Sequence, residues 1–411
     1  MSSRAIIVGA GQAGAQCAIS LRQNGWAGEI ALIGAEEAPP YQRPPLSKAF
    51  LAGELPVERL LLRDRDFYAG AGIDLRLGES VTAIDRRDNV VVTSEGEALA
   101  YAKLFLATGM RPRGLDVPGA SLEGVGYLRT IEDARRLTPH FRAGASLVVV
   151  GGGYIGLEVA AMARKFGMNV VVVETGARLL GRVTGPDVSR FYLDAHRARG
   201  VDVRLGTTVA AFRDDGQGRL RTAILGDGTS IPCNVAVIGA GAIPNDEIAM
   251  YAGIEVDAGE GIIVDAAMRT SDPDIYAIGD CARAWSGFAR RRMRIESVAN
   301  AIEQARIAAA HACGLAPPAP ATPWFWSDQY DLKLQTAGLI ARGYDGSVVR
   351  GDPATGRFSV FYLDGARLVA LDAVNSPVEF NVAKRIIGHD IALDPARIVD
   401  QRMDARALLP A

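Results

Sequence analysis

The chain has 411 residues and a formal net charge of −2, with 49% hydrophobic and 22% charged residues. This balance is typical of a soluble enzyme with two or three domains, and no bulk charge points to nucleic acid or to a membrane. The stretch 147–163 is apolar but too short and interrupted to span a bilayer. The first strand is expected so close to the N-terminus that no signal peptide precedes it. Four scattered cysteines, without metal-ligand spacing, predict no metal site and indicate a reducing, cytoplasmic compartment. They are Cys17, Cys233, Cys281 and Cys313.

A glycine fingerprint follows the first predicted strand. The β-branched run Ala5–Val8 leads into Gly9-Ala10-Gly11-Gln12-Ala13-Gly14 and then into a predicted helix. In such a turn the first glycine bends the chain, the second lets the backbone approach a pyrophosphate, and the third lets the helix pack on the strand. A second strand, 29–33, is followed by Glu36, whose carboxylate can accept hydrogen bonds from a ribose.

The same pattern recurs in the middle of the chain. The run 147–150 leads into Gly151-Gly152-Gly153-Tyr154-Ile155-Gly156, and the strand 169–173 ends beside Glu174. Two fingerprints, each in its full strand–turn–helix–strand–acid context, predict two bound dinucleotides. A flavin and a nicotinamide are the most economical pair.

The remaining segments indicate how the chain is divided. The strand-like runs 75–77, 90–93 and 104–106 lead to Ala107-Thr108-Gly109, and the run 235–245 repeats that ending for the second fingerprint. This predicts an α/β fold of two Rossmann-like dinucleotide-binding domains, one inserted in the other. The predicted boundaries are 1–113 and 246–316 for an FAD-binding domain and 114–245 for an NAD-binding domain.

A third domain is predicted at the C-terminus. After a helix over 299–313, the proline-rich stretch 315–323 cannot continue the helix and is expected to be a linker. Beyond it, a C-terminal α+β (interface) domain is predicted over 317–411. Its expected antiparallel strands are 334–337, 347–350, 358–362 and 367–373, followed by a helix over 378–387.

Four motifs carry a family resemblance over nearly the whole chain. They are Arg43–Lys48 (RPPLSK), Gly151–Glu158, Ala277–Cys281 (AIGDC) and Pro323–Gln329 (PWFWSDQ). With them the chain resembles the FAD-dependent ferredoxin reductases of the glutathione-reductase-like flavoprotein superfamily, in the putidaredoxin-reductase-like group. The resemblance implies hydride transfer from NADH to FAD, then single-electron transfer to a separate 2Fe–2S ferredoxin. Such a ferredoxin serves a cytochrome monooxygenase or an aromatic-ring dioxygenase.

The resemblance also assigns FAD contacts residue by residue. The sequence departs from the family at the adenosine ribose, because the family acid falls directly after Gly34, where this chain has Ala35. Either Glu36 takes the place of the family acid, which we expect, or the contact with the adenosine ribose is lost. The implied FAD contacts are Gly9, Gly11, Ala13, Gly14, Glu36, Arg43, Lys48, Val81, Ala107, Thr108, Gly109, Arg129, Asp280, Val298 and Trp326.

The second fingerprint implies NADH as the reductant. Glu174 would repel a 2′-phosphate, which favours NADH over NADPH, although Arg178 and Arg182 follow closely and are able to bind phosphate. The implied NAD contacts are Gly151, Gly153, Tyr154, Ile155, Gly156, Glu158, Glu174 and Gly241.

Three residues are expected to act at the reacting rings. Family likeness places Lys48 near the flavin N5, paired with Glu158 beside the nicotinamide, and Tyr154 over the flavin where the nicotinamide stacks. In the alternative interpretation Lys48 is a surface lysine and Glu158 is an acid placed at a helix N-terminus by the helix dipole.

The cysteine pattern narrows the route of the electrons. Disulfide reductases of this superfamily need a cysteine pair beside the flavin, and 43–62 contains no cysteine. Cys281 is therefore interpreted as a buried small hydrophobe, and electrons are expected to leave the flavin directly to a separate protein. Family likeness places the ferredoxin-docking face at Arg63, Arg306, Trp326 and Lys333, although Trp326 could instead be a core residue.

Other interpretations of the chain remain open. A rubredoxin reductase would differ only in its acceptor, and a monodehydroascorbate reductase also performs one-electron reductions. An apoptosis-inducing-factor-like signalling flavoprotein would need a basic face and a leader. The arginine cluster 290–294 is the basic run of the sequence, and it is expected to be a solvated hairpin or a ferredoxin contact. We expect a monomer or a weak homodimer.

Overall fold

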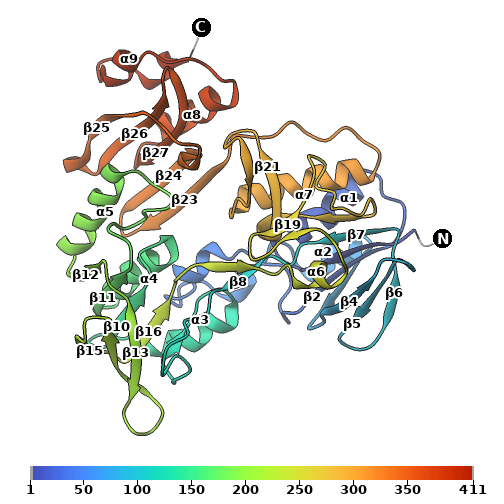
Figure 1. Ribbon diagram of the computed structural model, residues 1–411, viewed down its shortest axis with the longest axis horizontal. Helices are drawn as coiled ribbons and strands as arrows, with labels where there is room; N and C mark the ends of the chain where they lie inside the picture. The colour runs from blue at the N-terminus through green and yellow to red at the C-terminus, as the bar shows by residue number, and fades with distance from the viewer. Residues whose placement is uncertain (1–2, 410–411) are drawn as a thin grey trace. The chain divides into compact units, whose positions relative to one another are not determined.

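The computed structural model describes residues 3–409, and the chain divides into two compact units (Figure 1). The first unit contains the chain up to Gln42, then Glu58–Arg111 and Ile243–Pro323. The second unit contains Arg43–Val57, Pro112–Ala242 and the chain from Trp324 onward. The chain passes between them through the short strands β8 (Met110–Pro112) and β17 (Ala242–Pro244). The three-domain division remains a prediction.

The first unit is built on a parallel sheet in the order β20-β7-β1-β2-β3. Strands β1, β2, β7 and β20 are buried along most of their length, which is why they appear in the sequence as continuous apolar runs rather than alternating ones. Helices α1 and α7 pack against each other, and their buried residues include small side chains such as Ala18 and Ala305, which allow a close approach. The strands and helices of this unit are β1 (Ala5–Val8), α1 (Gln12–Gln23), β2 (Ile30–Gly34), α2 (Arg65–Gly70), β3 (Ile73–Leu77), β4 (Val81–Asp85), β5 (Val90–Thr93), β6 (Ala98–Ala100), β7 (Lys103–Leu106), α6 (Glu247–Tyr251), β18 (Val256–Asp257), β19 (Gly261–Ile263), β20 (Ile275–Ala277), β21 (Ala282–Ser286), β22 (Arg291–Met293) and α7 (Val298–Ala312).

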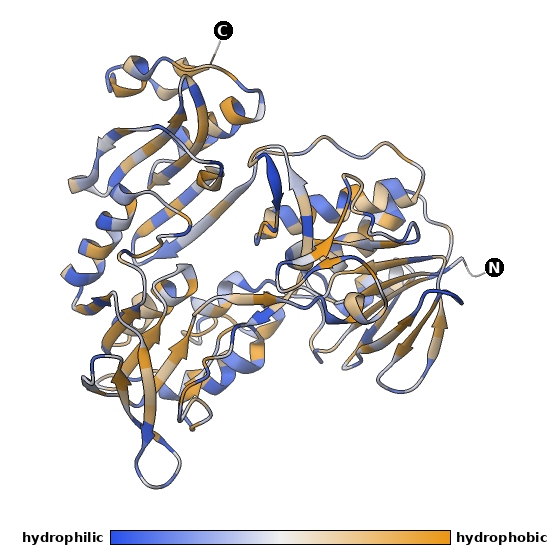
Figure 2. Cartoon of the chain, in the orientation of Figure 1, coloured by the Kyte–Doolittle hydropathy of each residue, from blue (hydrophilic) through white to orange (hydrophobic). Residues whose placement is uncertain are grey.

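The second unit contains two five-stranded sheets. One is parallel, in the order β12-β11-β10-β16-β9, and the other is antiparallel, in the order β23-β24-β27-β26-β25. Figure 2 shows apolar residues concentrated on their central strands. The strands and helices of this unit are β9 (Val125–Gly126), α3 (Ile131–Leu137), β10 (Ser146–Val150), α4 (Tyr154–Lys165), β11 (Asn169–Glu174), α5 (Pro186–Ala198), β12 (Val201–Leu205), β13 (Val209–Asp214), β14 (Leu220–Leu225), β15 (Ser230–Pro232), β16 (Val235–Ile238), β23 (Trp324–Gln329), β24 (Leu332–Gly338), β25 (Gly346–Asp352), β26 (Arg357–Asp364), β27 (Arg367–Val374), α8 (Pro377–Gly388) and α9 (Pro395–Val399).

Most elements expected from the sequence are present with small shifts at their ends. Both strand–turn–helix–strand fingerprints are confirmed, and the C-terminal strands form the expected antiparallel sheet. Of the smaller sheets β4-β5-β6 and β13-β14-β15, only the strand β5 was expected from the sequence. The other strands are short or half exposed and lack a long apolar run. Within residues 3–409 no helix is both long and apolar enough to cross a bilayer.

The close contact between the first fingerprint and its helix generates a stability prediction. A Cβ atom added to Gly14 would lie 1.9 Å from the Gly9 carbonyl oxygen, whereas one added to Gly11 would have nothing within 4 Å. Gly14→Ala is therefore expected to lower the free energy of unfolding by about 3 kcal/mol. Gly11→Ala, the matched control, should change it by less than about 1 kcal/mol. Urea unfolding of the flavin-free protein measures both, and equal stabilities would contradict the packing role of Gly14.

Candidate functional site

The turn between β1 and α1 has the geometry that a dinucleotide fingerprint requires. Gly9 adopts a positive φ of 110°, and a Cβ there would lie 2.2 Å from the Ala107 carbonyl oxygen. Gly11 is the N-cap of α1 and makes no side-chain capping bond. No side chain at Gly11 accepts hydrogen bonds from the first amides of α1, so these amides are able to donate to a phosphate. The open space at Gly11 leaves room for the phosphate to approach.

A cavity of about 390 Å³ opens beside this turn, within the first unit. It brings together Gly9, Val81 and Thr108, three of the residues assigned to FAD from the sequence. Its size and its position at the carboxyl ends of β1 and β2 fit the adenosine part of a dinucleotide. The lining residues are Val8, Gly9, Ile33, Ala35, Glu79, Ser80, Val81, Thr82, Thr108, Asn245, Glu247, Ile248 and Tyr251.

The carboxylate that serves the adenosine ribose is the point at which the sequence departs from the family. Ala35 lines the cavity, and the Glu36 carboxylate accepts a hydrogen bond from the Tyr41 hydroxyl at 2.5 Å. A second acid, Glu79, lines the cavity, is buried, and accepts from Arg76 Nε at 2.7 Å. Sequence reasoning missed Glu79 because it follows β3 rather than the second strand of the fingerprint. The ribose contact of Glu36 stays a prediction.

The other residues assigned to FAD fall in both units. Ala13, Ala107, Gly109, Asp280 and Val298 lie in the first unit, whereas Arg43, Lys48, Arg129 and Trp326 lie in the second. Asp280 follows β20 in a short 3₁₀ turn, where its carbonyl oxygen accepts from Arg294 Nη1 at 3.0 Å. In the second unit Arg43 Nη1 donates to the Arg129 carbonyl oxygen at 2.6 Å. Their roles toward the flavin remain predictions.

The second fingerprint repeats the construction of the first. Helix α4 begins at Tyr154, its N-cap Gly153 makes no side-chain capping bond, and a Cβ on Gly156 would lie 2.2 Å from the Gly151 carbonyl oxygen. Ile155, the second residue of α4, is exposed, and Gly241 follows β16 with a positive φ. The helix N-terminus therefore offers its amides in the same way as α1 does.

Glu174 lies at the end of β11 and is held by the backbone. Its two carboxylate oxygens accept from the Gly152 and Gly176 amides, each at 2.6 Å. Arg178 is bound elsewhere, since its Nη1 donates to the Thr184 carbonyl oxygen and to Ser189 Oγ, each at 2.7 Å. This arrangement fixes a negative charge at the end of β11 and leaves Arg178 engaged. The contact of Glu174 with the nucleotide ribose stays a prediction.

Helix α4 carries a buried carboxylate that is paired with a lysine and hydrogen-bonded. Glu158 Oε2 lies 2.8 Å from Lys48 Nζ, and their side chains are 3% and 20% exposed. Ser47 Oγ donates to Glu158 Oε2 at 2.5 Å, and Ser327 Oγ donates to Oε1 at 2.7 Å. A buried charge is tolerated only when it is paired and hydrogen-bonded, and these three donors meet that requirement. The expected pair is present, and neither a surface lysine nor a solvated helix-dipole acid describes it.

The aromatic residues of the C-terminal motif pack on the same helix. The Tyr154 ring stacks on Phe325 with centroids 4.5 Å apart, and burial raises the pKa of Tyr154 well above its ordinary value. Trp326 is half-buried and stacks on Trp324 with centroids 5.5 Å apart. Tyr154 therefore contacts β23 of its own unit, and its position over the flavin remains a prediction.

The predicted docking residues are accessible. Arg63, Arg306 and Lys333 are exposed, with the first two in the first unit and Lys333 in the second together with Trp326. The docking face stays a prediction. The arginines 290–292 lie exposed on the hairpin of β21 and β22, as expected for a solvated hairpin.

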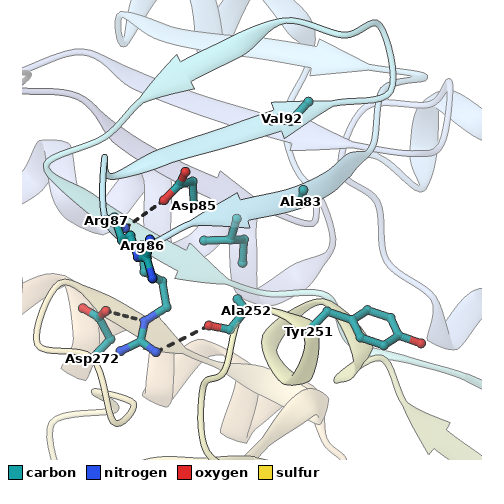
Figure 3. Close-up of a pocket in the computed structure, with 9 residues that line it drawn as sticks. Ala83, Asp85, Arg86, Arg87, Val92, Tyr251, Ala252 and Asp272 are labelled. Carbon is teal, nitrogen blue, oxygen red and sulfur yellow. Dashed lines mark hydrogen bonds and ion pairs between the residues drawn. The ribbon is translucent and has the colours of Figure 1, made fainter.

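A larger open cavity of about 720 Å³ contains none of the residues assigned from the sequence (Figure 3). One of its two arginines, Arg86, is engaged by Asp272 at 2.8 Å and by the Gly253 carbonyl oxygen at 3.0 Å. We assign no ligand to it. The lining residues are Ala83, Ile84, Asp85, Arg86, Arg87, Val92, Tyr251, Ala252 and Asp272.

The thiols are placed for packing rather than for redox chemistry. All four cysteines are free, and Cys281 is buried, as the sequence predicted, with burial raising its pKa. Across residues 3–409, no group of three or more His, Cys, Asp or Glu side chains could hold a metal ion.

Comparison with known proteins identifies the family. Residues 3–305 match the model of the pyridine nucleotide-disulphide oxidoreductases, and residues 324–409 match a reductase C-terminal domain. The chain belongs to the pyridine nucleotide-disulphide oxidoreductase family. It is therefore an oxidoreductase whose cofactors are FAD and a pyridine nucleotide.

Individual relatives place the chain in the expected group. It is 48% identical to putidaredoxin reductase of Pseudomonas putida over 410 residues, covering 99% of this chain and 96% of that protein. It is 45% identical to a ferredoxin–NAD(P)(+) reductase of Sphingomonas sp. over 392 residues, covering 95% and 94%. The crystal structure of the covalent putidaredoxin reductase–putidaredoxin complex matches with a TM-score of 0.96 at 47% identity, covering 98% of this chain and 97% of that one. The putidaredoxin-reductase-like resemblance is confirmed.

The buried ion pair generates a kinetic prediction. Lys48→Ala should slow flavin reduction by NADH about a hundredfold, because a fixed cation is removed from the position proposed to lie beside the reacting ring. FAD should stay bound, since the fingerprint is untouched. The matched control is Lys165→Ala on α4, the helix that carries Glu158, because the pair of Lys165 with Glu54 is solvent-exposed. Stopped-flow absorbance measures both, and an unchanged rate for Lys48→Ala would make the pair purely structural.

The geometry of Glu174 generates a specificity prediction. The kcat/KM for NADH should exceed that for NADPH by at least about a hundredfold, because a fixed carboxylate meets the 2′-phosphate. Glu174→Gln should narrow the ratio about tenfold by removing that charge. Asp202→Asn, an exposed acid in the same unit, should not change it. Comparable values for the two nucleotides in the wild-type protein would refute the assignment.

Proposed function

We propose that the protein is an NADH:ferredoxin oxidoreductase that passes single electrons to a separate 2Fe–2S ferredoxin. The ferredoxin would serve a cytochrome monooxygenase or an aromatic-ring dioxygenase. The observation that carries the proposal is similarity over nearly the full length of the chain to ferredoxin reductases, including the C-terminal domain. The buried Lys48–Glu158 pair in the second fingerprint helix supports it.

Each fingerprint has a distinct task in this function. FAD, when bound, accepts a hydride and releases electrons one at a time. The turn at Gly9–Gly14 and the cavity beside it would hold the FAD pyrophosphate and adenosine. The turn at Gly151–Gly156 would hold the NADH pyrophosphate, and Glu174 would hold the NADH ribose.

The ion pair would tune the reacting region by charge. Lys48 supplies a cation in a half-buried position, where an electrostatic interaction is stronger than in bulk water. Glu158 holds that cation in one place through a 2.8 Å contact and is itself held by two serine hydroxyls. The pair would therefore stabilise negative charge on the reduced flavin without having to reorganise during the reaction.

The thiols support direct transfer from the flavin to a partner protein. None of the four cysteines forms a disulfide, and the three at 17, 233 and 281 are buried. A disulfide relay through this chain is therefore not available, and the acceptor must approach the flavin edge. Free cysteines also suit a reducing cytoplasmic compartment, which we propose as the location.

An acidic ferredoxin would dock on exposed cations, and this generates a salt-dependence prediction. Electrostatic steering raises association rates and is screened by salt. Ferredoxin-dependent turnover should therefore fall as salt rises, whereas NADH-driven ferricyanide reduction should fall much less. Arg306→Glu should reproduce this selective loss at low salt.

The control for docking is an exposed arginine elsewhere in the same unit. Arg87→Glu reverses a charge beside the larger cavity and should leave ferredoxin turnover unchanged. Equal losses with ferredoxin and ferricyanide in Arg306→Glu would assign Arg306 to the flavin site instead. Faster turnover with rubredoxin than with any 2Fe–2S ferredoxin would replace the proposed acceptor.

A further inference from the structure

A continuous chain of hydrogen bonds runs within the second unit from the half-buried Tyr330 to the buried Glu158 carboxylate. The Tyr330 hydroxyl lies 3.1 Å from His196 Nδ1, and His196 Nε2 lies 2.9 Å from Gln329 Oε1. Gln329 Nε2 donates to Ser327 Oγ at 3.2 Å, and Ser327 Oγ donates to Glu158 Oε1 at 2.7 Å. His196, Gln329 and Ser327 are each 0% exposed.

The donor and the acceptor of every bond in this hydrogen-bond chain follow from the Glu158 carboxylate at its inner end. The Glu158 carboxylate, paired with Lys48, only accepts hydrogen bonds, so Ser327 must donate to it. Ser327 has a single proton and therefore accepts from the Gln329 amide nitrogen.

The same reasoning fixes the histidine at the outer end. The Gln329 amide oxygen then faces His196, which must donate from Nε2. Burial lowers the pKa of His196 to about 4, so the ring is neutral and carries one proton. That proton is on Nε2, which leaves Nδ1 to accept from the Tyr330 hydroxyl.

We propose that His196, Gln329 and Ser327 are positioning residues that keep the Ser327 hydroxyl donating to Glu158. The inference rests on the role proposed above for the Lys48–Glu158 pair. Lys48 and Ser47 both bind Oε2, and Ser327 binds Oε1, so Ser327 fixes the rotation of the carboxylate. Without this bond the carboxylate loses the donor that aims Oε2 at Lys48.

A pair of variants tests the direction of the chain rather than its presence. Ser327→Ala removes the donor. Gln329→Glu keeps the size of the side chain but presents acceptors to both neighbours, so the Ser327 hydroxyl turns away from Glu158. Each should slow flavin reduction by NADH about tenfold, the scale of one lost charge-assisted hydrogen bond. Because both act through the same bond, the double variant should be no slower than either single variant.

Two further variants separate positioning from general packing. Ser327→Thr retains the hydroxyl and should restore the rate. Ser359→Ala is the matched control, because Ser359 is a buried serine of β26 whose hydroxyl has no hydrogen-bond partner. A wild-type rate in Ser327→Ala, or equal losses in Ser327→Ala and Ser359→Ala, would overturn the proposal.

The second readout does not depend on activity. Nitrogen-15 NMR distinguishes the two neutral histidine tautomers, and the chain has only four histidines. His196 should be the Nε2–H form and should not titrate between about pH 6 and pH 8. In Glu158→Gln the new amide can donate to Ser327, so the constraint is lifted and the Nδ1–H form should appear. An Nδ1–H tautomer in the wild-type protein, or a Glu158→Gln spectrum identical to wild type, would overturn the proposal.

The two readouts separate this inference from the function on which it rests. Unchanged flavin reduction in Lys48→Ala would remove the proposed role of the ion pair. The tautomer of His196 would still decide whether the hydrogen-bond chain has the inferred direction. If Gln329→Glu does not fold, the tautomer of His196 is measured in Gln329→Leu, which removes both polar atoms of the side chain. Loss of the single Nε2–H form in Gln329→Leu supports the proposal.

Discussion

The burial of one carboxylate organises the second unit. Glu158 is 3% exposed in its side chain and has to be satisfied by donors that its own helix does not supply. Ser47 and Lys48 come from the proline-rich segment, and Ser327 comes from the first strand of the C-terminal sheet. Two stretches that are far apart in the sequence are therefore held against α4 by a single charged group. Removing that charge would affect the folding of the unit as well as its chemistry, because each donor would lose its acceptor.

The two nucleotide-binding turns depend on a different constraint, the close approach of backbone to backbone. In each fingerprint the third glycine lies against the carbonyl oxygen of the first, with room for hydrogen but not for a methyl group. The middle glycines, Gly11 and Gly153, face open space instead. Within six residues, glycine therefore allows tight packing of helix on strand at one position and leaves open space at another. This space is the proposed access of a phosphate to the helix amides.

The redox character of the protein follows from where its charges and thiols lie. The four cysteines are free and three of them are buried, which supports the proposed route of the electrons through the flavin rather than through sulfur. The anchored Glu174 and the engaged Arg178 support the proposed preference of the nucleotide site for a ribose with two hydroxyls. These features act together with the buried ion pair, because a reductase of this kind must both select its reductant and stabilise the charge that the reductant delivers.

The sequence by itself determined both fingerprints, the antiparallel C-terminal sheet and the Lys48–Glu158 pairing. Glycine spacing and apolar runs are local signals that follow from backbone sterics, and the pairing came from a family motif. The carboxylate for the ribose at the first fingerprint was not settled by the sequence, because Ala35 lines the cavity and a second acid, Glu79, lines it from the segment after β3. Only the tertiary structure showed the chain from Tyr330 through His196 and Gln329 to Ser327. His196 lies on α5, Ser327 and Gln329 lie on β23, and Tyr330 lies in the turn after β23. The sequence pattern around these residues does not indicate that they contact one another. Hydrogen-bond partners between distant segments are decided by packing, and no local pattern in the sequence encodes them.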